Sequence, residues 1–304
     1  MNLNLYRGCA HDCVYCDGRS ERYRAPEDFA GAVEVKTNAL AVLRREFARQ
    51  FGDEHLQQEL FWGTDSGLNG GDRQAGGVPP PDLPLDGRRG KRSGFLTLGG
   101  GVSDQYQPLE AQYRLARGVL GLCLEWQIPV HLLTKSALPL RDLDLLGAIN
   151  QKSRAVVSVS LTTVDEAIAR VVEPGAASPA ERLDVLRRCS AAGIPTGVFL
   201  LPLLPGITDQ PEMIRETIRA AAAAGASFVQ MGGLTLKPGR QMEHYLEKTA
   251  RPFPAAHALT RELYAQANEH GIPLTDAAWD RWERMHAAWL QTTQEFGVAR
   301  RMPR

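Results

Sequence analysis

The chain has 304 residues, 43% of them hydrophobic and 23% charged, with a formal net charge of zero and a sequence pI near 7.1. This balance is typical of a soluble globular protein with one large domain, or one domain and an appendage. It excludes a global basic surface for nucleic acid, although a local basic groove stays compatible with it. No apolar run reaches the roughly 18 residues that span a bilayer, and no secretory signal is visible. We therefore expect a cytoplasmic protein without membrane contact, in which clustered cysteines more often bind metal than form disulfides.

The first predicted element is a short strand over residues 3–7, and three of the five cysteines follow it directly. Cys9, Cys13 and Cys16 fall within eight residues, so three thiolates can converge on one inorganic centre. Structural zinc usually has four protein ligands, so a closed zinc site would need one more. The nearest candidates are polar neighbours in the same loop: His11, Asp12 and Asp17.

The two remaining cysteines, Cys123 and Cys189, stand alone in helix-like stretches and are expected to be small buried apolar residues. The site therefore has three thiolates and one open coordination position, and open positions on metal centres are where chemistry occurs. A 4Fe–4S cluster held by cysteine thiolates fits, because one iron then lacks a protein ligand and can bind a substrate. An incomplete zinc knuckle or a redox cysteine pair is the alternative.

Residues 63–94, after the first predicted helix, are rich in glycine, proline and charge and nearly lack large apolar side chains. Such a segment cannot build a core and is predicted to be a flexible insert before the second strand. A surface insertion is favoured over a lid. Its basic end at 87–94 is expected to be solvated charge rather than a phosphate contact.

Beyond the insert, short apolar runs alternate with helical patterns, which is typical of an α/β fold with a parallel sheet covered on both faces. A helix is expected after the capping box at 178–181, and another after the similar stretch at 209–212. With the strand at 3–7 there are six predicted strands, which favours a complete or partial barrel. The further strands are predicted at 95–99, 129–134, 155–161, 196–203 and 227–232.

Glycines and polar side chains follow the predicted strands, where reacting groups gather in parallel barrels. The glycines at 99–101 allow backbone to approach a ligand closely. Ser103 offers a hydroxyl, and Lys135 offers a point charge suited to a carboxylate. Asp104 either contributes to this site or caps the helix that starts near Pro108. Glu173 either faces the ligand or anchors its own loop through Arg182.

The tail at 236–304 shows two amphipathic helical patterns, at 257–270 and 276–296. We expect a barrel over 1–235 and a C-terminal helical extension over 236–304. The three tryptophans of the tail are expected to pack against the barrel rather than to stack on bases: Trp279, Trp282 and Trp289.

The spacing Cys-x3-Cys-x2-Cys, with Tyr15 before the last cysteine, resembles the signature of the radical S-adenosylmethionine (SAM) enzymes. The phrases TKS…LRDLDLL and EPGAASPAERL resemble the spore photoproduct lyase-like branch of that superfamily, often labelled DNA repair photolyase-like. The similarity covers about residues 3–235. It implies a partial (β/α)6 barrel, related to the TIM barrel, in which the cluster loop follows the first strand.

The resemblance also implies an activity and a set of site residues. The cluster cysteines would bind one 4Fe–4S cluster, whose open iron chelates SAM. One electron, supplied by a flavodoxin or ferredoxin, would cleave SAM to methionine and a 5′-deoxyadenosyl radical that abstracts a substrate hydrogen. The reaction would be lyase- or oxidoreductase-like, with the substrate unidentified and nucleic acid a candidate by family association. The residues implied at the SAM site are Tyr15, Gly100, Gly101, Ser103, Asp104, Lys135 and Ser160.

Two positions depart from the lyases. Gly101 stands where they carry a cysteine that returns hydrogen to the product radical, and Asp17 stands where they carry a tyrosine on the same path. Neither side chain has a usable weak bond to hydrogen, so repair of spore photoproduct is not expected. A non-catalytic metal or iron–sulfur protein that uses the barrel as a scaffold is the alternative function. Ser103, Lys135 and Ser160 favour the enzyme, because a purely structural site needs no SAM pocket.

Overall fold

The computed structural model describes residues 2–62 and 95–303, with side chains left out over 52–62, so the insert predicted at 63–94 lies outside the described residues. Its main feature is a six-stranded parallel sheet in the order β1-β4-β5-β6-β7-β8, with β1 and β8 at the two edges. The α/β partial barrel expected from the sequence is confirmed. The strands are β1 (Asn2–Leu3), β4 (Leu96–Leu98), β5 (Val130–Thr134), β6 (Ala155–Leu161), β7 (Thr196–Leu203) and β8 (Phe228–Gly233).

The single strand predicted over 3–7 is wrong. The chain forms β1 in the main sheet and then β2 (Tyr6–Arg7), which pairs antiparallel with β3 (Glu34–Val35) in a separate two-stranded sheet. The break is at Leu5, whose backbone N–H donates to Gln105 Oε1 at 2.6 Å and whose carbonyl accepts from the Lys36 N–H at 3.0 Å. Because both backbone groups of Leu5 have partners outside the sheet, β1 ends at Leu3.

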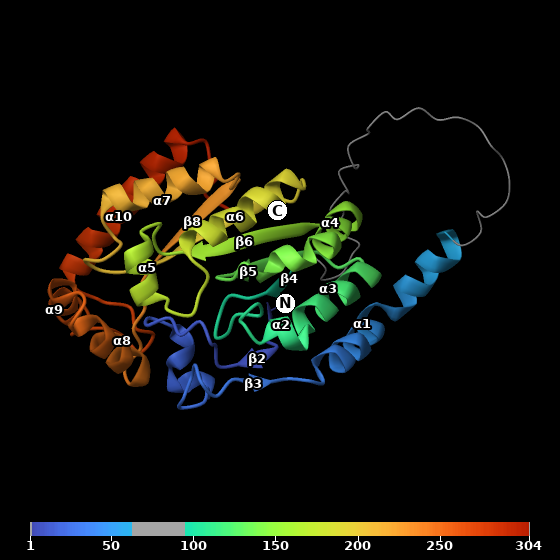
Figure 1. Ribbon diagram of the computed structural model, residues 1–304, viewed down its shortest axis with the longest axis horizontal. Helices are drawn as coiled ribbons and strands as arrows, with labels where there is room; N and C mark the ends of the chain where they lie inside the picture. The colour runs from blue at the N-terminus through green and yellow to red at the C-terminus, as the bar shows by residue number, and fades with distance from the viewer. Residues whose placement is uncertain (1, 63–94, 304) are drawn as a thin grey trace.

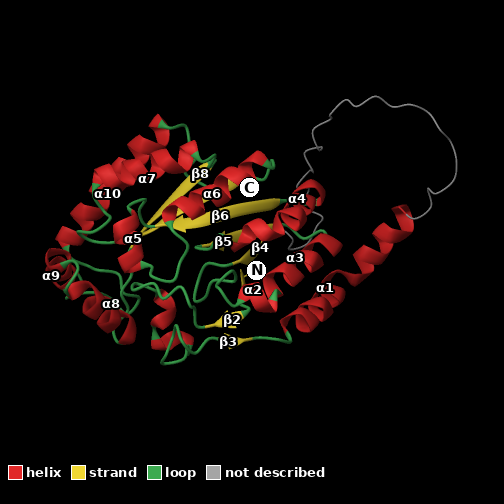
Figure 2. Cartoon of the chain, viewed as in Figure 1, coloured by secondary structure: helices red, strands yellow, loops and turns green. Residues whose placement is uncertain are grey.

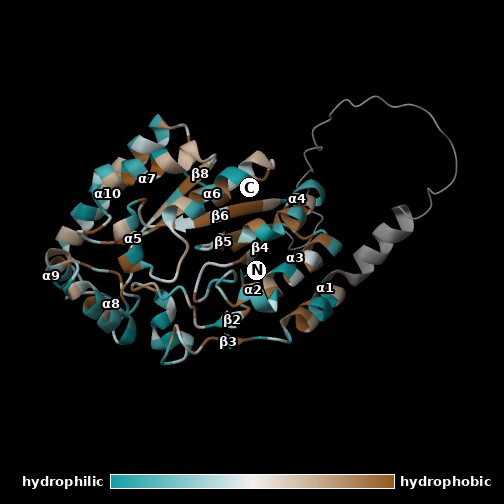
Figure 3. Cartoon of the chain, viewed as in Figure 1, coloured by the Kyte–Doolittle hydropathy of each residue, from teal (hydrophilic) through white to brown (hydrophobic). Residues whose placement is uncertain are grey.

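The strands are mainly apolar, which fits the helices that cover the outside of the sheet (Figures 1 and 2). Every residue of β6 is buried, and Figure 3 shows its ribbon in the brown of hydrophobic residues. The helices before the C-terminal extension are α1 (Ala39–Trp62), α2 (Glu110–Tyr113), α3 (Leu115–Glu125), α4 (Leu143–Lys152), α5 (Glu166–Val172), α6 (Pro179–Ala191) and α7 (Pro211–Ala223). Three short 3-10 turns complete this part: η1 (Asp17–Arg19), η2 (Glu21–Tyr23) and η3 (Leu138–Asp142).

The capping box that predicts α6 is confirmed: Ser178 accepts from the Glu181 N–H, and Glu181 accepts from the Ser178 N–H. The similar stretch before α7 is not a capping box. Its N-cap is Gln210, which makes no side-chain cap bond. The Asp209 carboxylate is instead bound by Arg281 of the last helix, so it is not available to cap α7.

The C-terminal extension has three helices rather than two: α8 (Arg240–Ala250), α9 (Pro254–Leu263) and α10 (Asp276–Glu295). The pattern at 276–296 is confirmed as α10. The pattern at 257–270 is displaced, because a proline at the first turn starts α9 at Pro254 and the chain turns back through a bridge between Ala267 and Pro273. The prediction missed α8.

The extension packs on the barrel mainly through α10, which lies against α7 and β8 (Figure 1). Trp289 donates its indole N–H to the Val229 carbonyl at 3.0 Å, and Trp282 packs against the core, as expected. Trp279 is 65% exposed, so the prediction that it packs against the barrel is wrong. After α10, Ala299 pairs with β8 at Phe228 and covers part of that edge strand. Among the helices of the described residues, none is both long and apolar enough to cross a bilayer.

Candidate functional site

The loops that follow the strands of the main sheet surround one cavity of about 220 Å³. It lies at the carboxyl ends of the strands, where parallel barrels place their reacting groups. Every site residue predicted from the sequence lines it, although their roles in binding a cluster or SAM stay predictions. These residues are Cys9, Cys13, Tyr15, Cys16, Gly100, Gly101, Ser103, Asp104, Lys135 and Ser160.

The loop after β1 brings three free thiols to the cavity: Cys9 and Cys13 are buried and Cys16 is partly buried. The backbone fixes this loop, since the Cys9 N–H donates to Phe29 O at 3.0 Å and the Cys16 N–H donates to Cys13 O at 3.1 Å. Burial raises the pKa of Cys9 to about 12 and also raises the pKa values of Cys13 and Cys16. Thiolates at these positions therefore need a positive centre beside them.

The three polar neighbours considered as a fourth ligand have other partners. The His11 ring lies between the Gly175 carbonyl, 2.9 Å from Nδ1, and Asp104 Oδ2, 3.2 Å from Nε2. The Nε2 contact is an ion pair when both ring nitrogens of His11 carry a proton. Asp12 pairs with Arg19, and Asp17 pairs with Lys237. Within the described residues, no three His, Cys, Asp or Glu side chains are arranged to bind a single metal ion.

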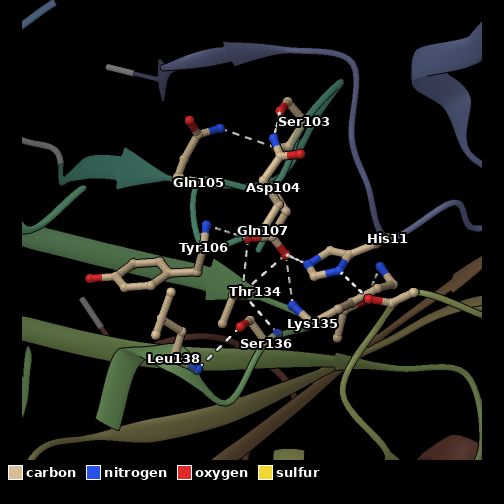
Figure 4. A network of polar contacts seen from close by, with 12 residues as sticks. His11, Ser103, Asp104, Gln105, Tyr106, Gln107, Thr134, Lys135, Ser136 and Leu138 are labelled. Carbon is tan, nitrogen blue, oxygen red and sulfur yellow. Dashed lines mark hydrogen bonds and ion pairs between the residues drawn. The ribbon is translucent and has the colours of Figure 1, made fainter. Parts of the chain in front are cut away.

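Asp104 is the centre of the polar network in Figure 4. Its carboxylate accepts from the Tyr106 N–H at 2.8 Å, the Thr134 hydroxyl at 2.9 Å and the Lys135 N–H at 2.8 Å. Burial by itself raises the pKa of Asp104, but the charge of His11 and the hydrogen bonds to the carboxylate lower it to about 2. An ionised Asp104 thus joins the loops after β1, β4 and β5.

The alternative interpretation of Asp104 as a helix cap is wrong, because α2 begins later, at Glu110, with Leu109 as its N-cap. The sequence could not separate the two roles, since the partners of the carboxylate come from a loop 30 residues further along the chain.

Lys135 carries positive charge into the cavity. Its Nζ donates to Ser160 Oγ at 3.1 Å and lies 5.7 Å from the centroid of the Tyr15 ring. Burial lowers the pKa of Lys135, but the negative charges of Cys13 and Glu173 outweigh that effect and raise it. The ammonium therefore stays charged next to the cysteine loop.

Glu173 anchors its own loop, one of the two roles considered for it. It is 2% exposed and does not belong to the lining of the cavity. Arg182 Nη2 donates to Glu173 Oε2 at 2.5 Å, and the Tyr15 hydroxyl donates to Oε1. Burial raises the pKa of Glu173, but the charges of Arg182 and Lys135 lower it below its usual value. This buried pair holds the Tyr15 ring beside the cavity.

The hydroxyl groups of Ser103 and Ser160 donate their hydrogens to other groups of the protein. Ser103 donates to the Gly8 carbonyl at 3.0 Å, and Ser160 donates to the Leu201 carbonyl at 3.2 Å. A hydroxyl has two acceptor lone pairs. One lone pair of Ser103 accepts from Gln107 Nε2, and one lone pair of Ser160 accepts from Lys135 Nζ. Towards a ligand, each serine can thus act as an acceptor.

The glycines after β4 adopt backbone conformations that other residues avoid, with φ of +104°, +73° and +114° at Gly99, Gly100 and Gly101. A Cβ atom at Gly99 would lie 1.8 Å from the Leu133 carbonyl oxygen. Gly100 and Gly101 therefore bring bare backbone to the wall of the cavity.

Sequence reasoning missed the contribution of the last two strands. Leu201 and Pro202 of β7 line the cavity, as do residues 233–235 at the end of β8. The segment after β8 also holds the cysteine loop: Gln241 Nε2 donates to the Tyr15 carbonyl at 3.0 Å, and Lys237 pairs with Asp17. Only a general feature of the sequence could have indicated these residues: the carboxyl end of a sixth barrel strand lies at the same edge of the sheet as the other strand ends.

Comparisons with known proteins agree with this fold. The Radical SAM superfamily model matches residues 86–221. An uncharacterised protein of Mycobacterium bovis is 31% identical over 266 residues, covering 86% of this chain and 66% of the relative. One from Methanocaldococcus jannaschii is 31% identical over 147 residues, 48% of this chain and 53% of the relative. This chain thus spans somewhat less than two thirds of the length of the mycobacterial relative.

Among solved structures, spore photoproduct lyase complexed with dinucleoside spore photoproduct matches with a TM-score of 0.59. The match covers 97% of this chain and 73% of the lyase at 14% sequence identity, so it shows a shared fold. Together with the strand order, these findings confirm the resemblance noted in the sequence: residues 86–221 belong to the radical SAM superfamily.

Proposed function

We propose that the chain is a radical SAM enzyme that holds one 4Fe–4S cluster through Cys9, Cys13 and Cys16 and binds SAM in the adjoining cavity. The observation that carries the proposal is that one cavity contains two buried thiols and a partly buried one, a partly buried ammonium group and a wall of bare glycine backbone. When bound, the cluster would supply the electron that cleaves SAM to methionine and a 5′-deoxyadenosyl radical, which abstracts hydrogen from the substrate.

The residues of the cysteine loop fit a polynuclear cluster. Burial disfavours thiolates at Cys9, Cys13 and Cys16 unless positive charge is close, and iron supplies that charge. In a cluster each thiolate ligates a different iron, so the three side chains need not meet at one point, as they must around a single zinc ion. His11, Asp12 and Asp17 have other partners, which fits a site with one iron open to SAM.

The cavity residues fit the polar groups of SAM. The Lys135 ammonium has three donors, and one of them is used by Ser160. We assign the remaining donors to the SAM carboxylate. Ser103 and Ser160 can each accept a hydrogen bond, and Tyr15 offers a ring held by Glu173 for the adenine. Asp104 acts as a positioning residue, because its carboxylate already accepts three hydrogen bonds from the protein.

The reaction is proposed to be lyase- or oxidoreductase-like, and it is not the repair of spore photoproduct. Gly101 has no side chain to return hydrogen, and the Asp17 carboxylate is bound by Lys237 and the Tyr23 hydroxyl. The other two thiols are buried in the outer helices α3 and α6. A nucleic acid stays a candidate substrate through family association alone.

The wider setting of the enzyme is also a proposal. A flavodoxin or ferredoxin would donate the electron, and the reaction would occur in the cytoplasm. We propose residues 1–235 as the catalytic barrel and 236–304 as an extension that packs on it.

Anaerobic reconstitution with iron and sulfide tests the proposal. The expected result is about four irons and four sulfides per chain, and formation of 5′-deoxyadenosine after reduction in the presence of SAM. A cluster that forms without any SAM cleavage would favour the alternative, a non-catalytic iron–sulfur protein on a barrel scaffold. Stoichiometric zinc without iron in anaerobically purified protein would contradict the enzyme and favour the same alternative with a structural metal ion.

A further inference from the structure

A second cavity, of about 350 Å³, lies between the carboxyl ends of β7 and β8 and the helices α9 and α10. We propose that it binds an uncharged aromatic group of the substrate whose hydrogen is abstracted in the first cavity. The inference rests on the proposed function and adds the chemical class of the substrate to it. It stands on three independent features: the pairing of the charged groups in the wall, the exposed apolar rim, and the residues shared with the first cavity.

The charged groups of the wall are paired within the protein, and so is its tyrosine hydroxyl. Asp209, whose side chain is 2% exposed, accepts from Arg281 Nε at 3.0 Å and also from Arg281 Nη2. The Tyr264 hydroxyl donates to the Leu234 carbonyl. Because the carboxylate and the guanidinium neutralise each other, a charged ligand would find no opposite charge in this wall, and burying an unpaired charge is costly. The cavity therefore favours an uncharged group.

The rim of the cavity is apolar and exposed. Trp279 is 65% exposed and Ile272 is 47% exposed, and both line the cavity, so two of the seven exposed large hydrophobic residues in the described chain lie at its edge. Trp279 and Trp282 both belong to the lining. Exposed apolar patches of this kind mark binding sites, and indole rings favour flat aromatic partners through offset or edge-to-face packing. An aromatic ring fits better than an aliphatic group of equal size.

The second cavity adjoins the first, because the strip formed by residues 233–235 lines both. The first cavity, at about 220 Å³, is smaller than the roughly 300–1,000 Å³ usual for ligand sites, and the proposed function already assigns it to SAM. The body of a substrate must therefore lie outside it. The second cavity is within the usual range and begins at the end of β8, beside the cysteine loop.

The test uses matched probes on the full chain, both as purified and after reconstitution. Binding of p-cresol, 4-methylcyclohexanol and 4-methylbenzoate is measured by saturation-transfer NMR titration. We expect p-cresol to bind, 4-methylcyclohexanol to bind about three- to tenfold more weakly, and 4-methylbenzoate to bind more weakly by on the order of tenfold or more. Equal binding of all three, or no binding of p-cresol, would overturn the proposal.

Two variants locate the probe. Trp279→Ala should weaken p-cresol binding about three- to tenfold, whereas Tyr113→Ala, which truncates an aromatic residue 40% exposed on α2, should leave it unchanged. Ala278→Phe should block the cavity, and Ala277→Phe, at an exposed neighbour on the same helix, should not. Unchanged binding in both Trp279→Ala and Ala278→Phe would refute the site. A reconstituted cluster without probe binding would refute this inference alone, and probe binding without any cluster would refute the proposed function alone.

Discussion

The loop after β1 and the segment after β8 line the same cavity and contact each other, yet they differ in how they are encoded. The first carries Cys9, Cys13 and Cys16, whose type and spacing indicate an inorganic centre from the sequence alone. The second contributes residues 233–235 and the holding contacts of Lys237 and Gln241, which are residue types found on any protein surface. The reactive residues can thus be identified from a local sequence pattern. The contacts that hold their loop come from residues 220 positions away and can be identified only in the fold.

The largest expected effect falls on the loop after β1. Changing Cys9, Cys13 or Cys16 to Ala should abolish the iron content and the cluster absorbance after reconstitution, because each removal takes one thiolate from the cluster. Iron analysis and the visible absorption spectrum provide the measurement. Cys123→Ala and Cys189→Ala are the matched controls, since both thiols are buried in outer helices. Loss of iron in the controls as well would contradict the assignment.

The next largest effect tests the segment after β8. Gln241 is fully buried and its amide group donates to Tyr15 O at 3.0 Å and Thr235 O at 2.7 Å. Gln241→Ala leaves those carbonyls without this partner and should lower the free energy of unfolding by about 2–4 kcal/mol, measured by urea denaturation. Gln151→Ala, at an exposed position on α4, should have little effect. Equal stability of the two variants would show that the segment does not hold the cysteine loop.

Lys135 lies in the loop after β5, between the two regions, and tests SAM binding separately from the cluster. Lys135→Ala should weaken SAM binding by about 1.5–3 kcal/mol, the usual value of a hydrogen bond to a charged group. The iron content should not change, because Lys135 is not a thiolate ligand. Binding is measured by titration of the reconstituted protein, with the exposed Lys152→Ala as control. Unchanged SAM affinity in Lys135→Ala would refute the assigned role.

The last prediction concerns an activity that we expect to be absent, the repair of spore photoproduct by the wild-type protein. Wild-type protein should produce 5′-deoxyadenosine but release no thymine from spore photoproduct, because Gly101 and Asp17 offer no hydrogen to return. The assay is an anaerobic reaction with the dinucleotide, followed by mass spectrometry. Gly101→Cys should gain repair if the cavity accepts that substrate, while Gly101→Ala bears the same strain at φ +114° without a thiol. Multi-turnover repair by the wild type would contradict the argument from these two positions.

The periodic parts of the fold could be predicted from the sequence. The capping box of α6 and the fully buried, mainly apolar run of β6 show their structure within a few residues, because local bonds and burial on both faces determine it. Strand β1 was predicted too long, because the chain leaves the sheet where Gln105 binds Leu5, a contact between residues 100 positions apart. Such a contact leaves no local pattern.

The site divides in the same way. The thiols, the glycines after β4 and Lys135 could be identified because their chemistry is unusual at strand ends. The network of Asp104 could not, since an aspartate near a helix start is equally typical of a cap, and its partners come from other loops. The exposure of Trp279 was also missed, because a tryptophan in an amphipathic helix usually packs inward. The exposed Trp279 lies at the rim of the second cavity.

The most direct test of the central claim is the formation of 5′-deoxyadenosine by the anaerobically reconstituted chain with SAM and a reductant, quantified by liquid chromatography and mass spectrometry. The proposal predicts that wild-type protein forms it, that Cys123→Ala forms it equally, and that Cys13→Ala forms none. Protein that contains the full cluster but forms no 5′-deoxyadenosine, or a Cys13→Ala variant that forms as much as the wild type, would contradict the claim.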